Sequence, residues 1–413
     1  FRTLAKRESI NRAVEKRSAE VFSKFLEDLT HVKEIFEHGR KNPPVSRAHP
    51  PASGAAFWAL SLKHRVDHQF ALFPADFAPQ SEVRHEAETE LHKLTAALQD
   101  YITRTHSKWA DAVVADENLP GRLQEPIIIR RDTASRMLEA NFSKDIALVL
   151  SEVYYWKQLG YDVPNVADDI YGKRETLRTM REKVLGLVHD YNSITNKLNT
   201  EERGMFRERI LALDNAVDPG LENLTWSHAP AVQDFLKVCN EQTQAVGKLV
   251  IDFKNGTDQV FERAQGLADV QFFNIRKKTT YKVQDFLEKQ AAHRTKTKQS
   301  LAQTHKEIVQ QMNKCYETFK SEAPEIQQEW AAFLRKVDNV IQESLMTAIR
   351  QSLRELERAV VGDDKTDTLQ PLLQVGASLV EGVGTTLKPT IEELASTILK
   401  ETREVIESTS SLP

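Results

Sequence analysis

The chain has 413 residues, of which 28% are charged and 40% are apolar, and its formal net charge is −4. Its 56 basic and 60 acidic residues are well mixed, which argues against the basic stripe typical of a dedicated nucleic-acid-binding surface. Only 15 glycines and 15 prolines occur, and so few helix breakers favour long uninterrupted elements. The two cysteines, Cys239 and Cys315, stand in polar, helix-like sequence surroundings. So few cysteines in so long a chain are typical of a reducing compartment and not of a disulfide scaffold.

The hydropathy and the ends of the chain indicate whether it spans a membrane and whether it is part of a longer protein. No apolar run approaches the roughly 20 residues that a membrane-spanning helix needs. The sequence begins with Phe1 instead of methionine and ends with Pro413. We therefore expect this chain to be an excerpt from a longer polypeptide.

Amphipathic helices are predicted through the first 115 residues. From residue 4 to about residue 38, apolar side chains recur at steps of mostly three, four or seven, as in a helix that buries one face. A rigid loop is expected at 43–54, because four prolines occur there. Further helices are predicted at 55–70 and 81–115, and the sequence Asn118-Leu119-Pro120-Gly121 ends the second of them.

The next segment contains the one run with a strand-like composition. Ile127-Ile128-Ile129-Arg130 is β-branched and short. It could form one strand of a small ribbon or an extended connector, and we favour the connector. Asp132 is then predicted to cap a helix over 133–159, which Gly160 and Pro164 end.

A corner between long helices is predicted near residue 220. Helices are expected at 165–199 and 200–219. The second should stop at Asp218-Pro219-Gly220, because proline lacks an amide donor and glycine has a permissive backbone. Trp226 follows, and Pro230 is placed in the first turn of the next helix.

Beyond the corner, the prediction is of long polar helices followed by a change of character. Helices are expected at 231–253, at 258–319 with a break near Asp269, and at 325–361. Asn255-Gly256-Thr257 is predicted to be a turn. The last fifty residues are richer in Thr, Gly and Val, which favours extended segments before a final helix over 390–408.

Together these elements predict a mostly all-α fold. We expect an elongated array of successive antiparallel helical bundles, with a small β element near 127–131 or 370–390. The predicted divisions are a bundle at 1–130, a bundle at 131–257 that contains the corner, a long-helix bundle at 258–361, and a connector with the start of a next bundle at 362–413. No fixed-period repeat occurs and heptads are not sustained, which disfavours repeat arrays and a two-stranded coiled coil.

Sequence patterns that would carry chemistry are missing. No Gly-x-x-x-x-Gly-Lys-Ser/Thr phosphate loop or dinucleotide fingerprint occurs, and the two cysteines are too isolated to bind zinc. The pairs His64/His68 and His85/His92 could each share a helix face, but we favour solvated faces over metal sites. We expect no catalytic residue, cofactor or metal in this chain.

Several charged and aromatic groups have structural interpretations. The acid pairs Asp168-Asp169 and Glu201-Glu202 stand at predicted helix starts, where carboxylates compensate the helix dipole. Arg276-Lys277-Lys278, with Phe272-Phe273 as an apolar anchor, could contact an acidic partner, but we favour a solvated helix face. The run Tyr154-Tyr155-Trp156 cannot all point one way on a helix, so part of it must be core and part must meet another helix or another chain.

The corner at 219–226 resembles the Pro-Gly-Leu-x-x-Leu-x-Trp segment in the N-terminal tail of dynein heavy chains. Further tail-like segments occur in the matching order on both sides, among them Pro-Pro-x-x-Gly-x-x-x-Trp at 50–58 and Pro-Thr-Ile-Glu-Glu at 389–393. Leu373 departs from the family pattern, where phenylalanine is frequent. The matching positions, which we interpret as structural and assembly residues, are Gly54, Trp58, Asn141, Phe142, Glu152, Leu159, Gly160, Pro164, Tyr191, Asn192, Pro219, Gly220, Leu221, Leu224, Trp226, Pro371 and Pro389.

The resemblance implies that the complete chain is an ATP-driven, minus-end-directed microtubule motor whose ATPase modules, with ATP and Mg²⁺, lie C-terminal to this segment. The segment itself would be a non-catalytic tail scaffold. Its implied partners are other dynein heavy chains, intermediate chains, light chains and light intermediate chains, and indirectly the docking complex and the doublet microtubule, with no nucleic acid and no membrane. The lead-in at 43–47 looks most like axonemal, outer-arm chains, which implies the cytoskeleton of a cilium or flagellum.

Other hypotheses about the function remain open at this point. They are a cytoplasmic dynein tail for cargo transport, a generic spectrin-like tether, a membrane-binding helical module and an undetected enzyme. The spectrin-like tether predicts a helical repeat of about 100 residues, which the sequence does not show. The mixed charge speaks against the membrane-binding module. Whether Trp226 is buried or lies at an interface is also left open.

Overall fold

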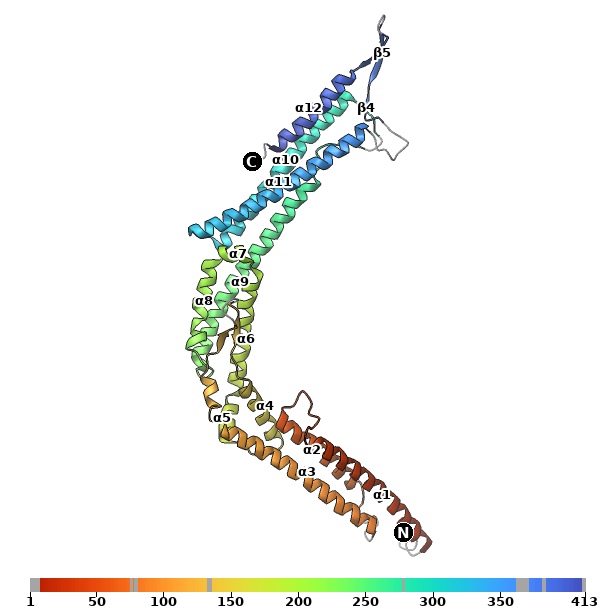
Figure 1. The fold of residues 1–413 in the computed structure, drawn as a ribbon, viewed down its shortest axis with the longest axis vertical. Helices are drawn as coiled ribbons and strands as arrows, with labels where there is room; N and C mark the ends of the chain where they lie inside the picture. Colours follow the sequence, from red (N-terminus) through yellow and green to blue (C-terminus); the bar gives the residue numbers. More distant parts are fainter. Residues whose placement is uncertain are drawn as a thin grey trace. The chain divides into compact units, whose positions relative to one another are not determined.

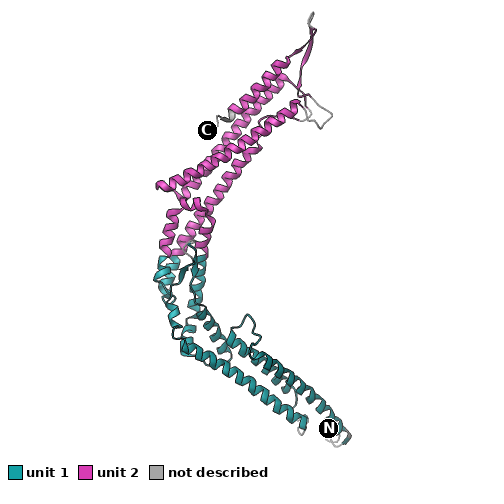
Figure 2. Cartoon of the chain, viewed as in Figure 1, with its two compact units in different colours: residues 1–188, 218–237 teal, residues 189–217, 238–413 magenta. Residues whose placement is uncertain are grey.

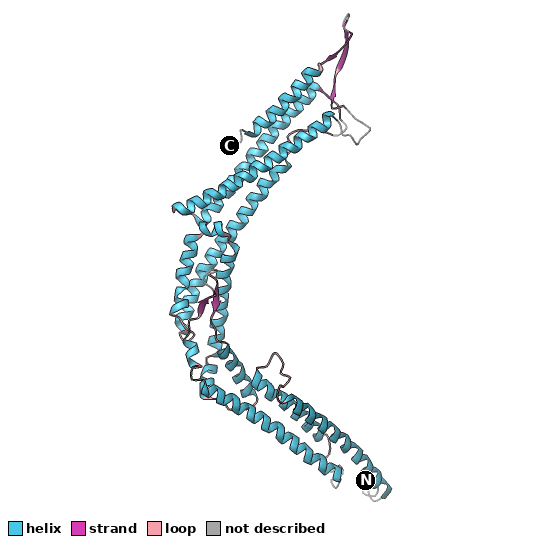
Figure 3. Cartoon of the chain, viewed as in Figure 1, coloured by secondary structure: helices cyan, strands magenta, loops and turns pink. Residues whose placement is uncertain are grey.

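A computed structural model describes residues 8–74, 77, 81–131, 136–276, 279–361, 371–380 and 384–410. Helices dominate these residues and the strands are short, which confirms the predicted mostly all-α class (Figures 1 and 3). The helices, in chain order, are α1 (Glu8–Gly39), α2 (Pro51–Ala71), α3 (Glu82–Ala115), α4 (Lys144–Gln158), α5 (Asn165–Gly172), α6 (Arg174–Lys197), α7 (Thr200–Met205), α8 (Arg207–Glu222), α9 (Ala229–Gly266), α10 (Val283–Phe319), α11 (Pro324–Val361) and α12 (Ile391–Ser410).

Three two-stranded ribbons accompany the helices in the described residues. The first is antiparallel and pairs β1 (Ile128–Arg130) with β2 (Leu138–Ala140). The second is parallel and pairs β3 (Tyr281–Lys282) with β4 (Leu373–Gln374). The third is an antiparallel hairpin of β5 (Gly376–Val380) and β6 (Gly384–Lys388). The β elements expected near 127–131 and 370–390 are both present.

The chain divides into two compact units, coloured separately in Figure 2. Unit 1 comprises residues 1–188 and 218–237, and unit 2 comprises residues 189–217 and 238–413. The helices α6, α8 and α9 therefore contribute residues to both units. The four-part division expected from the sequence stays a prediction.

The core of unit 1 begins where α1, α2 and α3 pack together. Phe22, Phe25, Leu29, Val32 and Phe36 recur every three to four residues of α1 and are all buried. They share a cluster with one face of α2, formed by Ala56, Ala59 and Val66, and with the leucine stripe of α3, formed by Leu91, Leu94 and Leu98. The hydrophobic effect of burying these stripes accounts for the three-helix packing, as the apolar spacing predicts.

The ribbon β1–β2 corrects two predictions. Residues 128–130 form a strand and not a connector, since Ile128 and Leu138 both bury their side chains from opposite strands. The helix predicted over 133–159 begins only at α4, because the Ser143 hydroxyl accepts hydrogen bonds from the amides of Asp145 and Ile146 and so caps it there. The cap predicted at Asp132 lies outside the described residues.

Other helix limits also differ from the prediction. The helix expected at 165–199 is divided at Lys173 into α5 and α6. The helix expected at 200–219 is divided at Phe206, and α8 continues through Pro219 to Glu222. Pro219 donates no amide hydrogen, but its carbonyl accepts hydrogen bonds from the amides of Asn223 and Leu224, so helical bonding continues beyond it.

Two predicted non-helical stretches are partly or wholly helical. The proline-rich loop ends at Pro50, and Pro51 takes the first position of α2, where an amide hydrogen is not needed. The turn predicted at Asn255-Gly256-Thr257 is helical, since α9 runs through it. A Cβ atom on Gly256 would lie 2.5 Å from the Cys315 sulfur, so this glycine allows α9 and α10 to pack closely.

Unit 2 has an aromatic core between its long helices. Phe206, Phe253, Phe319 and Phe333 are buried with ring centroids 5.3–6.1 Å apart in successive contacts, and Trp330 stacks on Phe333. A second cluster contains Phe272 and Phe273, each 3% exposed. These phenylalanines are therefore core residues and cannot serve as the apolar anchor that the sequence suggested for a partner. In the described residues no helix is long and apolar enough to cross a bilayer.

Candidate functional site

The candidate site of this chain is a set of buried joints between helices. The first, which we call the tryptophan joint, lies in unit 1 and consists of residues 123–128, 141–142 and 224–228. Trp226 is 3% exposed and its indole Nε1 donates to the carbonyl of Asn141 at 2.6 Å. Its ring meets Phe142 edge-on with centroids 4.8 Å apart. Trp226 is therefore a core residue of the joint and not a surface residue of the chain.

Backbone hydrogen bonds tie the three segments of the tryptophan joint together. The Ile127 amide donates to the carbonyl of Leu224 at 3.0 Å, and the Asn141 amide donates to the carbonyl of Ile127 at 2.9 Å. The Asn141 side-chain amide donates to Pro126 O at 2.9 Å. Ser227 adds a bond from its amide to Leu123 O at 3.2 Å. Because residues between 14 and 104 positions apart are joined in this way, the joint fixes where α8 ends and α9 begins.

Gly220 has a packing role beside the tryptophan joint. It is buried inside α8, and a Cβ atom there would lie 2.8 Å from the Phe235 ring and 3.1 Å from the Ile128 side chain. Only glycine therefore fits without displacing a neighbour. Pro219 is exposed, while Leu221 and Leu224 are half-buried. The sequence correctly singled out this stretch, although it is the last turn of a helix and not its stop signal.

The second joint, the glutamate cap, links α4 to the start of α2. The carboxylate of Glu152 accepts hydrogen bonds from the amides of Ala52 and Ser53 at 2.7 and 2.8 Å. Glu152 is 2% exposed. The first turn of α2 has no cap of its own, since Pro50 has no side-chain acceptor. The buried carboxylate satisfies these amides and compensates the positive end of the helix dipole.

The loop before α2 packs closely on the glutamate cap. A Cβ atom on Gly54 would lie 2.4 Å from the Val45 side chain, which explains the glycine at this position. Tyr155 donates from its hydroxyl to Ala48 O at 3.2 Å, and its ring lies 4.8 Å from that of His49. Trp58 is not in the cap; it faces Phe36 and Gly39 in the α1–α3 bundle.

The end of α4 is closed by Gly160, as the sequence predicts. Gly160 has a φ of +76°, in the left-handed region that favours glycine. The amide of Gly160 donates to Lys157 O at 3.1 Å and that of Tyr161 to Trp156 O at 3.0 Å. Trp156 is fully buried, whereas Tyr154 is 46% exposed. Trp156 is therefore core, as expected, and Tyr155 meets Phe57 of α2. A contact of Tyr154 with another chain stays a prediction. Leu159 is half-buried at this end, and Pro164 directly precedes α5.

The remaining signature residues belong to unit 2. Tyr191 is buried in α6, and its hydroxyl donates to the buried carboxylate of Asp214, while the neighbouring Asn192 is half-buried. Pro371 is exposed. Pro389 precedes Thr390, whose amide and hydroxyl exchange hydrogen bonds with Glu393 at the start of α12. The assembly roles of all these residues stay predictions.

Glu202 in unit 2 has a larger role than dipole compensation. It completes a capping box with Asn199 and is 4% exposed. The ammonium group of Lys254 lies 2.8 Å from its carboxylate and neutralises it. The charge of Glu202 and its place at a helix start predict its interaction with the helix dipole. Its partner Lys254 comes from α9, more than fifty residues away. Periodicity does not reveal such a pairing.

The two thiols of unit 2 are buried, which corrects the polar surroundings expected for them. Cys239 is 2% exposed and Cys315 is 1% exposed. Burial raises the pKa of each thiol from about 9 to about 11, because the interior disfavours the thiolate. Both therefore remain protonated at neutral pH. Among the described residues no group of three or more His, Cys, Asp or Glu side chains could hold a metal ion.

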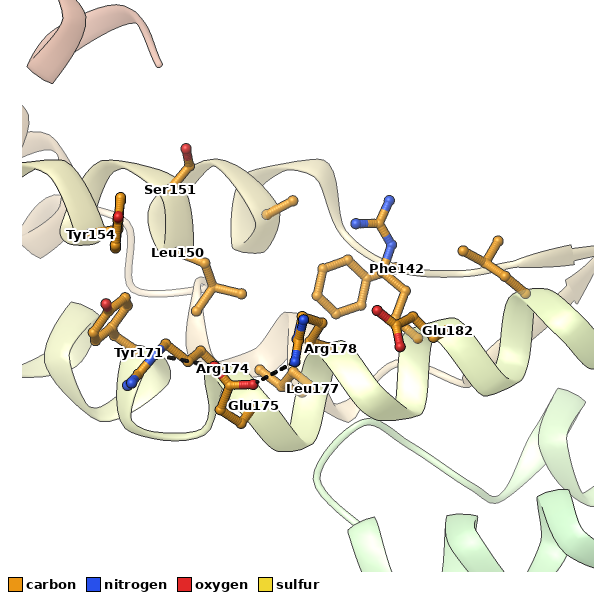
Figure 4. A pocket seen from close by; sticks show the side chains of 13 residues that line it. Phe142, Leu150, Ser151, Tyr154, Tyr171, Arg174, Glu175, Leu177, Arg178 and Glu182 are labelled. Atoms are coloured by element: carbon orange, nitrogen blue, oxygen red, sulfur yellow. Dashed lines mark ion pairs between the residues drawn. The ribbon is translucent and has the colours of Figure 1, made fainter. Parts of the chain in front are cut away.

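A cavity of about 600 Å³ opens between α4 and α6 in unit 1. Figure 4 shows Tyr154 and Tyr171 at one end of it, Phe142 at the other, and Leu150 between them. Arginines of α6 line it as well. The sequence did not reveal this cavity, although it singled out Phe142 as a signature position and Tyr154 in the aromatic run. Arg174, Arg178 and Arg181 are a further signal, since they are spaced along one helix.

Comparison with known proteins places the two joints in a family context. Residues 1–235, which include the tryptophan joint and the glutamate cap, match the family described as "Dynein heavy chain, N-terminal region 1". The whole chain is 30% identical to the dynein-1-beta heavy chain of the flagellar inner arm I1 complex of Chlamydomonas reinhardtii. Over 91% of its length it is 31% identical to human dynein axonemal heavy chain 2. It is 22% identical over 92% of its length to the Chlamydomonas flagellar outer-arm dynein beta chain.

The chain spans only 8–9% of the length of these relatives. The family match covers more than half of the chain and includes most of the positions at which the sequence resembles dynein tails. The protein therefore belongs to the dynein heavy chain family and contains its N-terminal region 1.

Proposed function

We propose that this chain is a non-catalytic tail segment of an axonemal dynein heavy chain, where it acts as a scaffold for assembly. The observation that carries the proposal is the match of residues 1–235 to the N-terminal region of dynein heavy chains. Long helices joined by buried hydrogen-bonded contacts suit this role, because close-packed interiors resist strain and transmit force. The proposed location is the axoneme of a cilium or flagellum, since the relatives named above are axonemal or flagellar.

The partners we propose are a second dynein heavy chain and the intermediate and light chains. ATP hydrolysis and movement toward microtubule minus ends are proposed for the complete heavy chain, with ATP and Mg²⁺ bound outside this segment. This assignment rests on the family and on the small share of the relatives' length that the chain covers.

The arm type is a finer question. The lead-in at 43–47 predicted an outer-arm chain, whereas identity is higher to the inner-arm I1 beta chain, at 30%, than to the outer-arm beta chain, at 22%. The identities favour an inner-arm assignment, and the outer-arm type stays a prediction. Fractionation of axonemal extract distinguishes an inner-arm from an outer-arm chain. We expect the full-length protein to co-purify with inner-arm and not with outer-arm subunits.

A pull-down tests the scaffold proposal. The purified 413-residue chain is immobilised and incubated with ciliary extract, and bound proteins are identified by mass spectrometry. We expect dynein intermediate chains, light chains or a second heavy chain above the level seen with a heat-unfolded sample of the same chain. Recovery of none of these subunits would contradict the proposal.

A further inference from the structure

Two neighbouring cavities in unit 1 form one continuous surface, which we call the α4 groove. The larger, of about 600 Å³, lies between α4 and α6, and a smaller one of about 370 Å³ lies between α4 and residues 47–50. Ala147 and Ser151 line both cavities, so the outer face of α4 is the ridge between them. The groove consists of the residues that line the two cavities.

The floor of the α4 groove is apolar and aromatic. Leu148 is 43% exposed, Tyr154 is 46% exposed and Leu185 is 46% exposed. Leu150 and Phe142 are half-buried and line the larger cavity (Figure 4). Exposed apolar side chains usually occur singly on a protein surface. Several of them gathered beside two cavities are characteristic of a binding surface.

The rim of the groove is basic although the chain as a whole is acidic. The two cavities are lined by five basic residues, namely Arg47, Lys144, Arg174, Arg178 and Arg181, and by two acidic ones, Glu175 and Glu182. The difference is a formal charge of +3, against −4 for the complete chain. The formal charge of the lining therefore attracts an acidic partner to this surface.

Two of the basic groups are held against aromatic rings of the groove. The guanidinium of Arg174 lies 4.5 Å from the Tyr171 ring centroid, and that of Arg181 lies 5.1 Å from the Phe142 ring centroid. Glu175 pairs with Arg178 at 3.0 Å, as the dashed line in Figure 4 shows. Positive charge and apolar surface are therefore interleaved, which suits an occupant that carries carboxylates beside apolar side chains.

A helix fits this groove better than an extended segment. The larger cavity is walled by α4, α5 and α6, whose backbone amides and carbonyls are already bonded within the helices. An extended peptide gains its affinity from a free strand edge, and no strand residue lines either cavity. An amphipathic helix instead places side chains at i, i+3, i+4 and i+7 into apolar hollows.

We propose that the α4 groove binds an acidic amphipathic helix of another subunit of the same assembly. The apolar stripe of that helix fills the two cavities on either side of Ala147 and Ser151, and its carboxylates face Lys144 and the arginines of α6. This proposal rests on the proposed function for the source of the partner, and on the groove for its chemistry.

Site-specific cross-linking tests the proposal in the assembled protein. A benzophenone amino acid replaces Ser151 in the full-length heavy chain, which is expressed in ciliated cells; axonemes are isolated and irradiated, and adducts are identified by mass spectrometry. Ser107, an exposed serine of α3 that lines neither cavity, is the matched control position. We expect the adduct at position 151, and not at 107, to map to an acidic amphipathic helical segment of another subunit.

Charge reversal gives the second arm of the test. The double variant Lys144→Glu with Arg178→Glu should reduce the yield of that adduct about tenfold, because like charges across an interface weaken binding. Arg104→Glu with Lys108→Glu on α3 is the matched control, and it should leave the yield unchanged. Circular dichroism of the 413-residue chain with each pair of substitutions checks that the melting temperature is preserved.

The outcomes separate the proposal from the function on which it rests. If the labelled chain enters axonemes with dynein subunits but position 151 gives no adduct, the helix-binding proposal is wrong. Adducts with lipid, with nucleic acid or with a basic or extended segment, or a yield insensitive to the groove reversal, also overturn it. If the labelled chain does not associate with dynein subunits at all, the proposed function itself fails.

Discussion

At the scale of single residues, Trp226 unites three segments that the sequence places far apart. Its ring packs on Phe142 and its Nε1 bonds to Asn141 O, while the backbone around it pairs with Ile127. The local sequence predicted an aromatic corner, but not the partners, because they come from a ribbon about a hundred residues earlier. Burial and a hydrogen-bonded indole together indicate a structural role.

Trp226→Ala should therefore destabilise unit 1 strongly. We expect a loss of about 3–5 kcal/mol in the free energy of unfolding, from the lost burial and the cavity left behind. Trp226→Phe keeps most of the ring but removes the indole donor, so it should cost less, about 1–3 kcal/mol. Urea unfolding followed by circular dichroism measures both. Equal stability of wild type and Trp226→Ala would show that the joint does not depend on this ring.

Glu152 provides a second residue-scale prediction, on the start of α2. Glu152→Gln leaves one carbonyl acceptor for two amides and places an NH₂ group against the other, so stability should fall by about 1.5–3 kcal/mol. Hydrogen exchange at residues 52–54 should become faster. Glu86→Gln, at an exposed position of α3, is the control and should change neither quantity. Unaltered exchange at the start of α2 in Glu152→Gln would contradict the cap.

The buried thiols predict a pH dependence in unit 2. The pKa of Cys239 and Cys315 is about 11 in the folded chain and about 9 without burial, so between these values the folded state binds more protons than the unfolded one. Stability should therefore fall as pH rises from about 9 to about 11, by on the order of 2 kcal/mol per thiol. The stability difference between wild type and the double variant Cys239→Ala with Cys315→Ala, measured by denaturant unfolding, should change over this range. A difference independent of pH would contradict buried thiols.

At the scale of elements, glycines illustrate why position decides the effect of a residue. Gly160 ends α4 with a positive φ, whereas Gly186 is exposed in the middle of α6 with open space where a Cβ would stand. Gly160→Ala should destabilise by about 1 kcal/mol. Gly186→Ala should stabilise by about 0.5–1 kcal/mol, because alanine is the better helix former. Thermal unfolding measures the two shifts, and the same sign for both would contradict this account.

Helices with a clear apolar period could be predicted from the sequence, while elements set by distant partners could not. The apolar stripes of α1 and α3 gave their positions to within a few residues, apart from the first residues expected for the first helix, which lie outside the described ranges. For β1 the composition left a ribbon strand and a connector both open, and its partner β2 was not predicted, because three-residue strands carry little periodic signal. The helical path through Gly256 was missed as well, since that glycine serves packing against Cys315.

The joints could be predicted in part. The signature positions Gly54, Glu152, Asn141 and Trp226 were all selected from the sequence, and the structure places them in two buried contacts. Their atomic partners could not be deduced, because the hydrogen bond from the Ala52 amide to the Glu152 carboxylate joins residues 100 apart. The α4 groove could not be found from sequence either, since its lining comes from three helices and two loops.

At the scale of the whole molecule, each compact unit has its own core and its own tie points. Unit 1 contains the α1–α3 bundle, the tryptophan joint and the glutamate cap, and unit 2 contains the aromatic core between its long helices. We propose that this segment assembles dynein subunits while the ATPase chemistry belongs to the rest of the heavy chain.

The most direct test removes residues 1–413 from the full-length heavy chain. Wild-type and shortened proteins are purified by the same C-terminal tag, and their ATPase rate and co-purifying subunits are measured together. We expect the shortened chain to keep ATPase activity but to lose intermediate chains, light chains or the second heavy chain. Retention of every subunit at the wild-type ratio would show that this segment does not assemble them.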